Sequence, residues 1–133
     1  MNKVQIILAM HDHLSFDLIQ AAKRFMDGVE QQVIPVPLTP ELTLDEYKKT
    51  FEKILQEHEQ VLVLTDVLAG ACTVALAQCI VKYPFFLVSG ANLSMLLTAI
   101  ENCTELTGEE LAKLVVETGR EDIKLVNQLV VGE

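Results

Sequence analysis

The sequence has few basic residues, few cysteines and no long apolar run, and each shortage excludes a class of protein. Its 10 lysine and arginine residues stand against 19 aspartate and glutamate residues, for a formal net charge of −9. A nucleic-acid-binding domain needs a basic surface to contact phosphates, so we expect no nucleic-acid partner. No apolar run approaches the ~18 residues of a membrane-spanning helix, which predicts no direct membrane insertion.

The cysteines, Cys72, Cys79 and Cys103, have no spacing typical of a metal centre, and their odd number argues against a disulfide framework. Free thiols fit a reducing compartment, and the N-terminal segment lacks the apolar length of a secretory signal peptide. We therefore expect a cytoplasmic protein with no metal and no cofactor. A length of 133 residues, 50% of them hydrophobic, is typical of one domain, assigned here to residues 1–133.

Apolar runs of strand length alternate with segments of helical periodicity along the whole chain. The runs predict strands at residues 4–9, 32–38, 61–64 and 85–88. The second run contains Pro35 and Pro37, which cannot donate to a ladder and therefore place it at a sheet edge. Helices are expected from Ser15 as N-cap towards Gly28, and over residues 44–55, 73–83, 92–101 and 107–119, two of them opened by the capping boxes at 43–46 and 107–110.

This alternation predicts an α/β fold, a three-layer sandwich with a mainly parallel sheet. The commonest compact strand order for such a sheet is 2-1-3-4, which also puts the proline-bearing strand at the edge. The tail, residues 122–131, alternates weakly between apolar and polar residues and suits a short final strand.

Two polar residues follow the strands that this order makes adjacent and central. His11 follows the first strand and Asp66 follows the third. Sites in open α/β sheets form at the carboxyl ends of such strands, so we expect the two side chains to face each other. A carboxylate bonded to one imidazole nitrogen fixes the tautomer and leaves the other nitrogen as a nucleophile.

A loop of small residues follows Asp66 and runs into the next helix. Its backbone N–H groups, over Gly70, Ala71, Cys72 and Thr73, are candidates to hold an anion such as a phosphoryl group. Nucleophile, orienting carboxylate and anion cradle together indicate phosphoryl transfer. Taken singly, each feature also has a structural explanation: a histidine in a loop, an aspartate capping a turn, and a glycine in a bend.

The other candidate residues favour structural explanations. His13 is expected to be exposed on the His11 loop, and His58 to interact with a helix dipole. Cys72 lies where a helix N-terminus would lower a thiol pKa, but a small apolar filler is the commoner role. Cys79 is expected on a packed helix face and Cys103 in a loop.

Four segments carry a resemblance to a known family. They are ILAMHDHLSFDLIQAA, VLVLTDVLAGACTVALA, VSGANLSMLLTAI and TGREDIKLVNQ, in this order along the chain. Together they resemble the enzyme IIA component of mannose-type sugar phosphotransferase systems. The first is similar to a strand followed by Thr-His-Gly, the second to Asp-Leu-Phe-Gly-Gly-Ser-Pro, and the third to Gly-x-Asn-Leu-Pro-Met-Leu.

The resemblance implies a phosphotransferase component that relays a phosphoryl group in the cytoplasm. His11 would be the phosphoacceptor and Asp66 the residue that orients it. The donor would be the histidine-containing phosphocarrier protein and the acceptor an enzyme IIB component. The family also implies a homodimer in which the last strand, here residues 123–131, is exchanged between subunits as an antiparallel edge strand.

The chain departs from the family pattern close to the expected site. The glycine after the histidine is Asp12 here, which places a negative charge beside the phosphoryl group. Ala69, Ala71 and Cys72 stand where the pattern has glycine, serine and proline. These changes remove a side-chain donor and keep the backbone donors.

Three alternatives stay open at this point. A non-catalytic regulatory or partner-binding module of the same fold would follow if Asp12 and Ala71 abolish the relay. A response-regulator receiver domain would also place an aspartate at Asp66, but it needs paired acids after the first strand and a lysine after the last core strand, and Lys124 lies in the tail. The related phosphocarrier of dihydroxyacetone kinases matches the loop less well.

Overall fold

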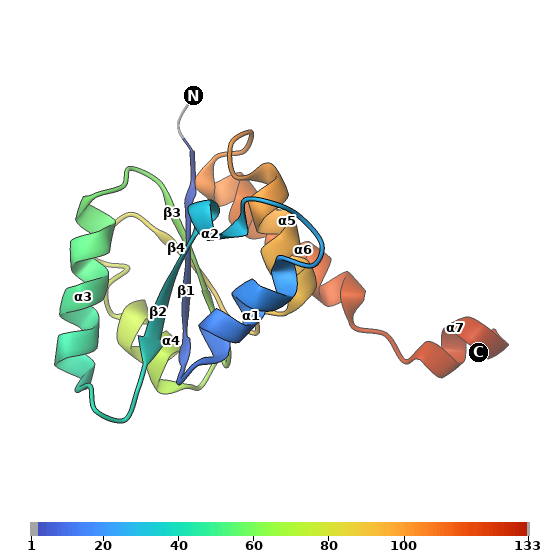
Figure 1. Cartoon of the computed structure of the whole chain (residues 1–133), viewed down its shortest axis with the longest axis horizontal. Helices are drawn as coiled ribbons and strands as arrows, with labels where there is room; N and C mark the ends of the chain where they lie inside the picture. Colours follow the sequence, from blue (N-terminus) through green and yellow to red (C-terminus); the bar gives the residue numbers. More distant parts are fainter. Residues whose placement is uncertain (1–2, 133) are drawn as a thin grey trace.

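The computed structural model describes residues 3–132 and contains a four-stranded sheet between two layers of helices (Figure 1). The strands are all parallel, in the order β2-β1-β3-β4. Their bounds are β1 Gln5–His11, β2 Val33–Leu38, β3 Val61–Thr65 and β4 Phe86–Val88. The predicted fold class and strand order are therefore confirmed. Residues 1, 2 and 133 of the domain predicted over 1–133 lie outside the described range.

Strand β2 lies at the sheet edge, as its prolines require. Pro35 and Pro37 stand opposite Leu8 and Met10 of β1, and no strand pairs with the other side of β2 within residues 3–132. A residue without an N–H costs no ladder bond on that open side.

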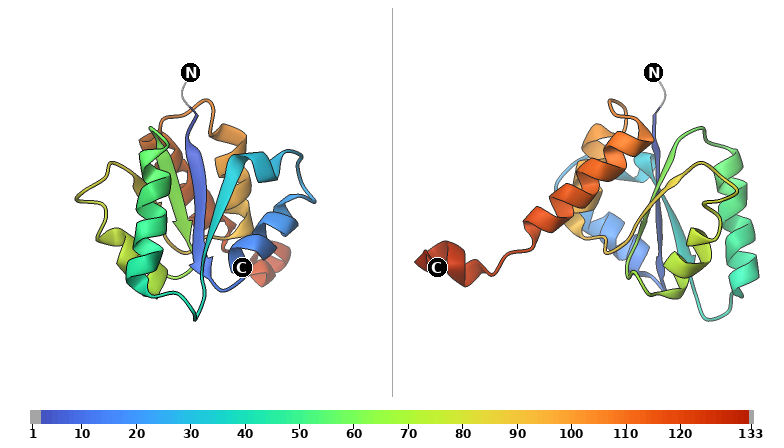
Figure 2. Two further views of the ribbon diagram at one scale, coloured as in Figure 1. Left: turned by 60° about the vertical axis from the view of Figure 1, so that its left-hand side comes forward. Right: turned by 180° about the vertical axis from the view of Figure 1, so that it is seen from behind.

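Helices cover both faces of the sheet and create two apolar cores (Figures 1 and 2). One face carries α1 (Leu14–Ala22), α5 (Leu93–Asn102) and α6 (Gly108–Asp122), and the other carries α3 (Leu44–Gln56) and α4 (Ala71–Ala77). Alternate β1 side chains enter the two cores, Ile6 and Leu8 the first and Ile7 the second. Because both faces are buried, the strand is apolar without alternation.

The predicted helix starts are confirmed at three helices. Thr43 Oγ1 accepts the Glu46 backbone N–H at 3.1 Å, and the Glu46 carboxylate accepts the Thr43 N–H at 2.9 Å. Thr107 and Glu110 form the same reciprocal pair before α6. Asn92 Oδ1 accepts the Met95 N–H at 2.9 Å before α5.

Helix α1 differs from the prediction at both ends. His13, and not Ser15, occupies the N-cap position, and Ser15 lies inside the helix. Its Oγ is buried without a hydrogen-bond partner among the residues that the structure describes. The helix ends at Ala22, and Gly28 adopts φ +74° before a short helix, α2 (Val29–Gln32). Of the apolar residues past Ala22, Met26 packs against the core and Phe25 is exposed, and neither belongs to the helix.

Helices α4 and α6 also differ from their predicted lengths. Helix α4 begins at Ala71 and ends at Ala77, against a prediction of residues 73–83. Helix α6 continues past Gly119 to Asp122. A Cβ at Gly119 would lie 2.8 Å from Met95 Cγ, so this glycine permits close packing of α6 on α5 and does not end the helix.

The tail corrects the prediction of a final strand. Residues Val126–Val131 form a helix, α7, which extends away from the body of the molecule (Figures 1 and 2). A strand in one chain would leave its backbone groups unpaired there, whereas a helical turn pairs them internally. Exchange of the tail between subunits stays a prediction. Over residues 3–132 no helix has the length and apolar character needed to cross a bilayer.

Candidate functional site

His11 and Asp66 face each other at the carboxyl ends of β1 and β3. The two atoms His11 Nδ1 and Asp66 Oδ2 are 2.8 Å apart, and the same oxygen accepts the His11 backbone N–H at 2.9 Å. The two strands are paired neighbours; His11 is the last residue of β1, and Asp66 directly follows β3. The pairing expected across the crevice is therefore present.

The carboxylate of Asp66 determines which imidazole nitrogen is free. Burial alone would raise the pKa of Asp66, but hydrogen bonds from the backbone and side chain of His11 outweigh it and lower that pKa. Its second oxygen accepts the Val67 N–H at 3.0 Å. An ionised carboxylate can only accept, so Nδ1 of His11 must carry the proton. In the neutral imidazole this leaves Nε2 without a proton and able to act as a nucleophile.

Gly70 lies directly against the imidazole ring. A Cβ at this position would be 2.8 Å from His11 Cε1 and 3.6 Å from Nε2. Its backbone has φ −75° and ψ 159°, which any residue adopts, so the glycine is required by the ring and not by the backbone. Gly70 precedes α4, and the first N–H groups of that helix have no acceptor within it.

A pair of threonine hydroxyls fixes the loop between β3 and α4. Thr73 Oγ1 lies 2.6 Å from the carbonyl oxygen of Val67 and 2.7 Å from Thr65 Oγ1. One arrangement satisfies both contacts: Thr73 donates to Val67, and Thr65 donates to Thr73. Sequence reasoning placed Thr73 in the anion cradle and missed this bond. Because its hydroxyl is engaged, only backbone groups of this turn are available to an anion.

Cys72 is completely buried beneath the His11–Asp66 pair. A ring nitrogen of His11, a carboxylate oxygen of Asp66 and the sulfur of Cys72 all lie within 4.8 Å of one another. Burial raises the pKa of the Cys72 thiol to about 11, so the group is protonated at neutral pH. A nucleophilic thiolate is thus disfavoured, in line with the sequence-based expectation.

The family follows from comparison with known proteins. Residues 5–116 match the family described as the PTS system fructose IIA component. The chain belongs to this family. No curated protein matches it by sequence.

Solved structures share the fold of this family member. A phosphotransferase system component EIIA from Streptococcus agalactiae has a TM-score of 0.86 at 21% identity, covering 94% of this chain and 98% of its own. A mannose/sorbose-specific IIA subunit from Enterococcus faecalis has a TM-score of 0.80 at 23% identity, with 92% and 93% covered. A sigma-54 interaction domain protein from Enterococcus faecalis has a TM-score of 0.75 at 11% identity, with 99% and 98% covered.

Asp12 adopts a left-handed conformation where the family pattern has glycine. Its φ is +51°, and it is the one non-glycine residue with positive φ in the described range 3–132. Aspartate enters this region more readily than most residues, so it can occupy a conformation that favours glycine. The side chain is exposed beside His11, where it adds a negative charge.

A shallow hollow lies next to the imidazole of His11. It has a volume of about 300 Å³ and is lined by His11, Asp12 and residues of the β2–α3 connection, among them Leu42 and Leu44. Exposed apolar side chains surround this end of the sheet: Leu14, Phe16, Leu42, Leu44, Val67 and Leu68. His11 therefore lies beside a surface with apolar character.

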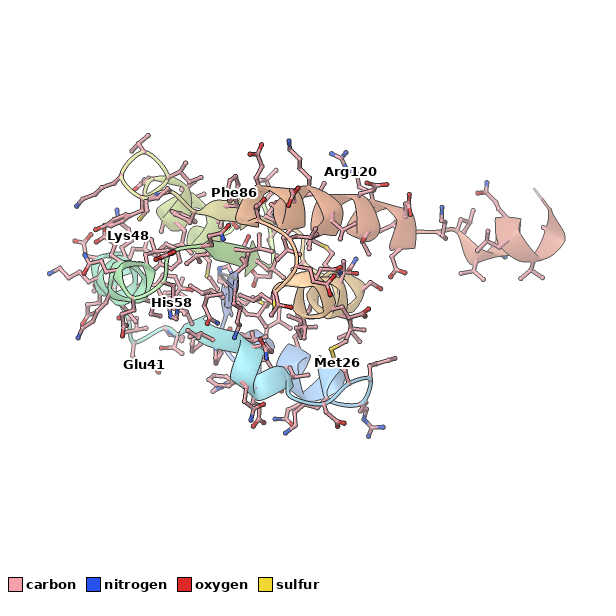
Figure 3. All side chains as sticks on the ribbon, turned by 90° about the horizontal axis from the view of Figure 1, so that it is seen from above. Met26, Glu41, Lys48, His58, Phe86 and Arg120 are labelled. Atoms are coloured by element: carbon pink, nitrogen blue, oxygen red, sulfur yellow. The ribbon has the colours of Figure 1, made fainter. Side chains whose placement is uncertain are left out.

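The remaining candidates do not join the site. The exposed His13 contacts the Phe16 ring, with centroids 6.1 Å apart. His58, labelled in Figure 3, lies between the end of α3 and the start of β3, whereas Asp66 follows the other end of β3. Cys79 and Cys103 are buried in the two separate cores.

Proposed function

We propose that His11 accepts a phosphoryl group from the histidine-containing phosphocarrier protein and passes it to an enzyme IIB component, in the cytoplasm. As a member of the IIA family, the chain is a component of a sugar phosphotransferase system. The relay itself rests on one observation. Asp66 holds the proton on Nδ1 of His11 and so leaves Nε2 free beside Gly70.

The transfer needs positioning more than acid–base chemistry. The lone pair of His11 Nε2 forms a bond to phosphorus as the bond between phosphorus and the donor's ring nitrogen breaks. The absence of a side chain at Gly70 leaves room beside the ring, and the N–H groups of Ala71, Cys72 and Thr73 supply dipoles for the phosphoryl oxygens. The same bond changes in reverse deliver the group to the enzyme IIB component.

The surface around His11 supports docking of carrier proteins. The six exposed apolar side chains at this end give a partner an apolar contact area. The net charge of −9 favours partners whose docking face is basic, because complementary charge accelerates encounter.

A labelling experiment tests the relay. The chain is incubated with labelled phosphoenolpyruvate, the general phosphotransferase enzyme and the phosphocarrier protein. We expect label on the wild type that is lost in acid and kept in base, as a phosphohistidine requires, and none on His11→Ala. A base-labile label that persists in His11→Ala would instead indicate a phosphorylated Asp66, and the relay through His11 would be wrong.

A second candidate function is a regulatory or partner-binding module without a relay. The charge at Asp12 favours it, and a sigma-54 interaction domain protein shares the fold. The variant Asp12→Asn separates the two functions, because asparagine also tolerates positive φ and only the charge is lost. If the relay operates, we expect the phosphorylated fraction at limiting donor to rise about two- to five-fold in low salt, and less in high salt. If the chain is a module without a relay, neither the wild type nor Asp12→Asn should be labelled.

We further propose that the chain forms homodimers through its tail. The apolar side chains of Ile123, Leu125, Val126, Leu129, Val130 and Val131 are all exposed. Within residues 3–132, strand β4 pairs only with β3, and a cavity of about 430 Å³, lined by Leu87, Met95 and Val116 among others, lies beside it. The tail of a second copy would cover this apolar surface.

Sedimentation measures the dimer directly. We expect a dimer for the wild type and a monomer for the double variant Leu129→Asp, Val130→Asp, because two charges in an apolar interface are costly to desolvate. The variant changes exposed residues only, so the monomer should keep its fold. A wild type that sediments as a monomer at all concentrations would contradict the proposal.

A further inference from the structure

Three side chains of different chemistry converge beneath the reactive imidazole. His11 offers a ring nitrogen, Asp66 a carboxylate oxygen and Cys72 a sulfur, and these three atoms lie within 4.8 Å of one another. Nitrogen, oxygen and thiolate sulfur are the ligand types that Zn²⁺ takes in proteins, and three protein ligands with one open position are typical of accessible zinc sites. Hard cations such as Mg²⁺ prefer all-oxygen sites.

The arrangement is close to the size that zinc requires. Bonds of about 2.0–2.3 Å at tetrahedral angles place ligand atoms about 3.3–3.8 Å apart. The longest of the three spacings, at most 4.8 Å, has to shorten by about an ångström, and the 2.8 Å between His11 Nδ1 and Asp66 Oδ2 has to lengthen by about half an ångström. Zinc replaces the hydrogen bond between these two atoms, and the His11 ring, which is 38% exposed, can rotate once that bond is released. Asp66 and Cys72 form the buried floor, and the exposed ring leaves one side open to an arriving ion.

The sulfur ligand is a property of this chain. Cys72 stands where the IIA pattern resembled by the sequence has proline, which offers no ligand atom. Among the described residues, Cys72 is the cysteine whose sulfur lies within 4.8 Å of ligand atoms of His11 and Asp66. The expectation of no metal, drawn from cysteine spacing alone, did not consider one cysteine joined by a histidine and an aspartate.

We propose that His11, Asp66 and Cys72 form a binding site for Zn²⁺, and that the bound ion prevents phosphorylation of His11. The claim that the ion prevents phosphorylation rests on the proposed relay. On binding, the Cys72 thiol releases its proton to solvent and the sulfur forms a bond to the metal. If zinc takes Nε2, the nucleophile is occupied. If zinc takes Nδ1, the ring proton moves to Nε2, which then has no free lone pair.

Cobalt provides a spectroscopic test of the site, since Co²⁺ occupies zinc sites and is coloured. Titration of the reduced, metal-free chain with Co²⁺ should give a sulfur-to-cobalt charge-transfer band and strong visible bands of tetrahedral coordination, both abolished by added Zn²⁺. We expect the sulfur band in the wild type and in Cys79→Ala, and its loss in Cys72→Ala and Cys72→Ser. Competition with a chromogenic chelator should show zinc affinity reduced more than ~100-fold in Cys72→Ala.

The variant His11→Ala tests whether weaker metal binding in Cys72→Ala could result from misfolding. Its side chain lies at the surface end of β1, and its removal should weaken zinc binding comparably while circular dichroism stays unchanged. A sulfur band that persists in Cys72→Ala, or a wild type without such a band, would overturn the metal site. So would zinc affinity that is equal in the wild type and Cys72→Ala.

The effect on the relay is measured separately. Purified, already phosphorylated phosphocarrier protein is the donor, so that no other enzyme is present, and transfer is followed with and without stoichiometric Zn²⁺. We expect zinc to stop transfer to the wild type. If Cys72→Ala accepts phosphate, inhibiting its transfer to the same extent should need more than ~100-fold more zinc. Unchanged transfer to a zinc-loaded wild type would refute the inhibition. If the wild type accepts no phosphate even without zinc, the proposed relay is wrong. The cobalt spectra test the metal site independently of that result.

Discussion

Replacement of Asp66 by alanine is expected to slow phosphorylation of His11 by ~10³-fold or more, because it removes the group that holds the imidazole in its reactive tautomer and orientation. One oxygen of Asp66 accepts both the backbone N–H and the Nδ1 proton of His11. Alanine removes both acceptors, so the ring is free to rotate and its proton to move to Nε2. Each change lowers the fraction of His11 that presents a lone pair to the donor.

Asparagine at position 66 should be much less damaging, and the contrast tests the mechanism. The amide oxygen can take the place of Oδ2 and keep both bonds to His11, while the amide nitrogen then faces the N–H of Val67. Val67 is exposed, so water can satisfy its N–H. Asparagine then keeps the geometry and loses only the negative charge of the acceptor, so we expect the phosphorylation rate to fall by ~10–10²-fold.

Single-turnover transfer from the phosphorylated phosphocarrier protein measures these rates. Asp27→Asn is the matched control, since Asp27 is exposed in the segment between α1 and α2, away from the carboxyl ends of the strands. Imidazole ¹⁵N resonances give the tautomer, which should be Nδ1–H in the wild type and in Asp66→Asn. A rate for Asp66→Ala within ten-fold of the wild type would show that Asp66 does not orient the histidine.

The residues of the site that could be predicted were those at the ends of strands. Strand order follows from proline chemistry at Pro35 and Pro37 and from the apolar runs, and a given order brings His11 and Asp66 to one edge. Capping boxes such as Thr43–Glu46 were equally predictable, because both partners are close in the sequence. Local chemistry and topology were enough for these features.

Other features depend on contacts that no local pattern encodes. The hydroxyl of Thr73 reaches Thr65, eight positions earlier, only because α4 turns back onto the end of β3. The proximity of Cys72 to His11 likewise depends on the path of the loop. In α6, Gly119 was interpreted as a stop because its contact with Met95 lies outside the helix. Tertiary packing decides all three.

The tail shows a different limit of prediction from sequence. Residues 123–131 are rich in apolar side chains, which indicates burial but not the partner. In the single chain, residues 126–131 of this segment form α7, and the apolar side chains of the whole segment are exposed. The weak alternation predicted a strand, and the single chain forms a helix there instead.

Replacement of Gly70 by alanine is expected to reduce the rate of phosphorylation ~10²-fold or more, because a displacement of about an ångström at the reacting atom has this effect. The new Cβ would lie 2.8 Å from His11 Cε1 and 3.3 Å from the Val67 carbonyl oxygen. The ring cannot move away freely, since Nδ1 is held by Asp66. Either the His11–Asp66 bond breaks or the loop shifts, and both displace Nε2 from the first turn of α4.

The same substitution should lower the free energy of unfolding by only about 1–2 kcal/mol, because the lost His11–Asp66 bond is partly offset by the lower entropy of the unfolded chain, and this separates an effect on the site from a loss of the fold. Alanine adopts the φ of −75° at position 70 without strain, and it lowers the entropy of the unfolded chain. Gly108→Ala is the matched control: its Cβ would meet the Phe86 ring at 3.2 Å, remote from His11, so it should alter thermal stability and leave transfer unchanged. Transfer by Gly70→Ala at the wild-type rate would mean that His11 does not react from the orientation in which Asp66 holds it.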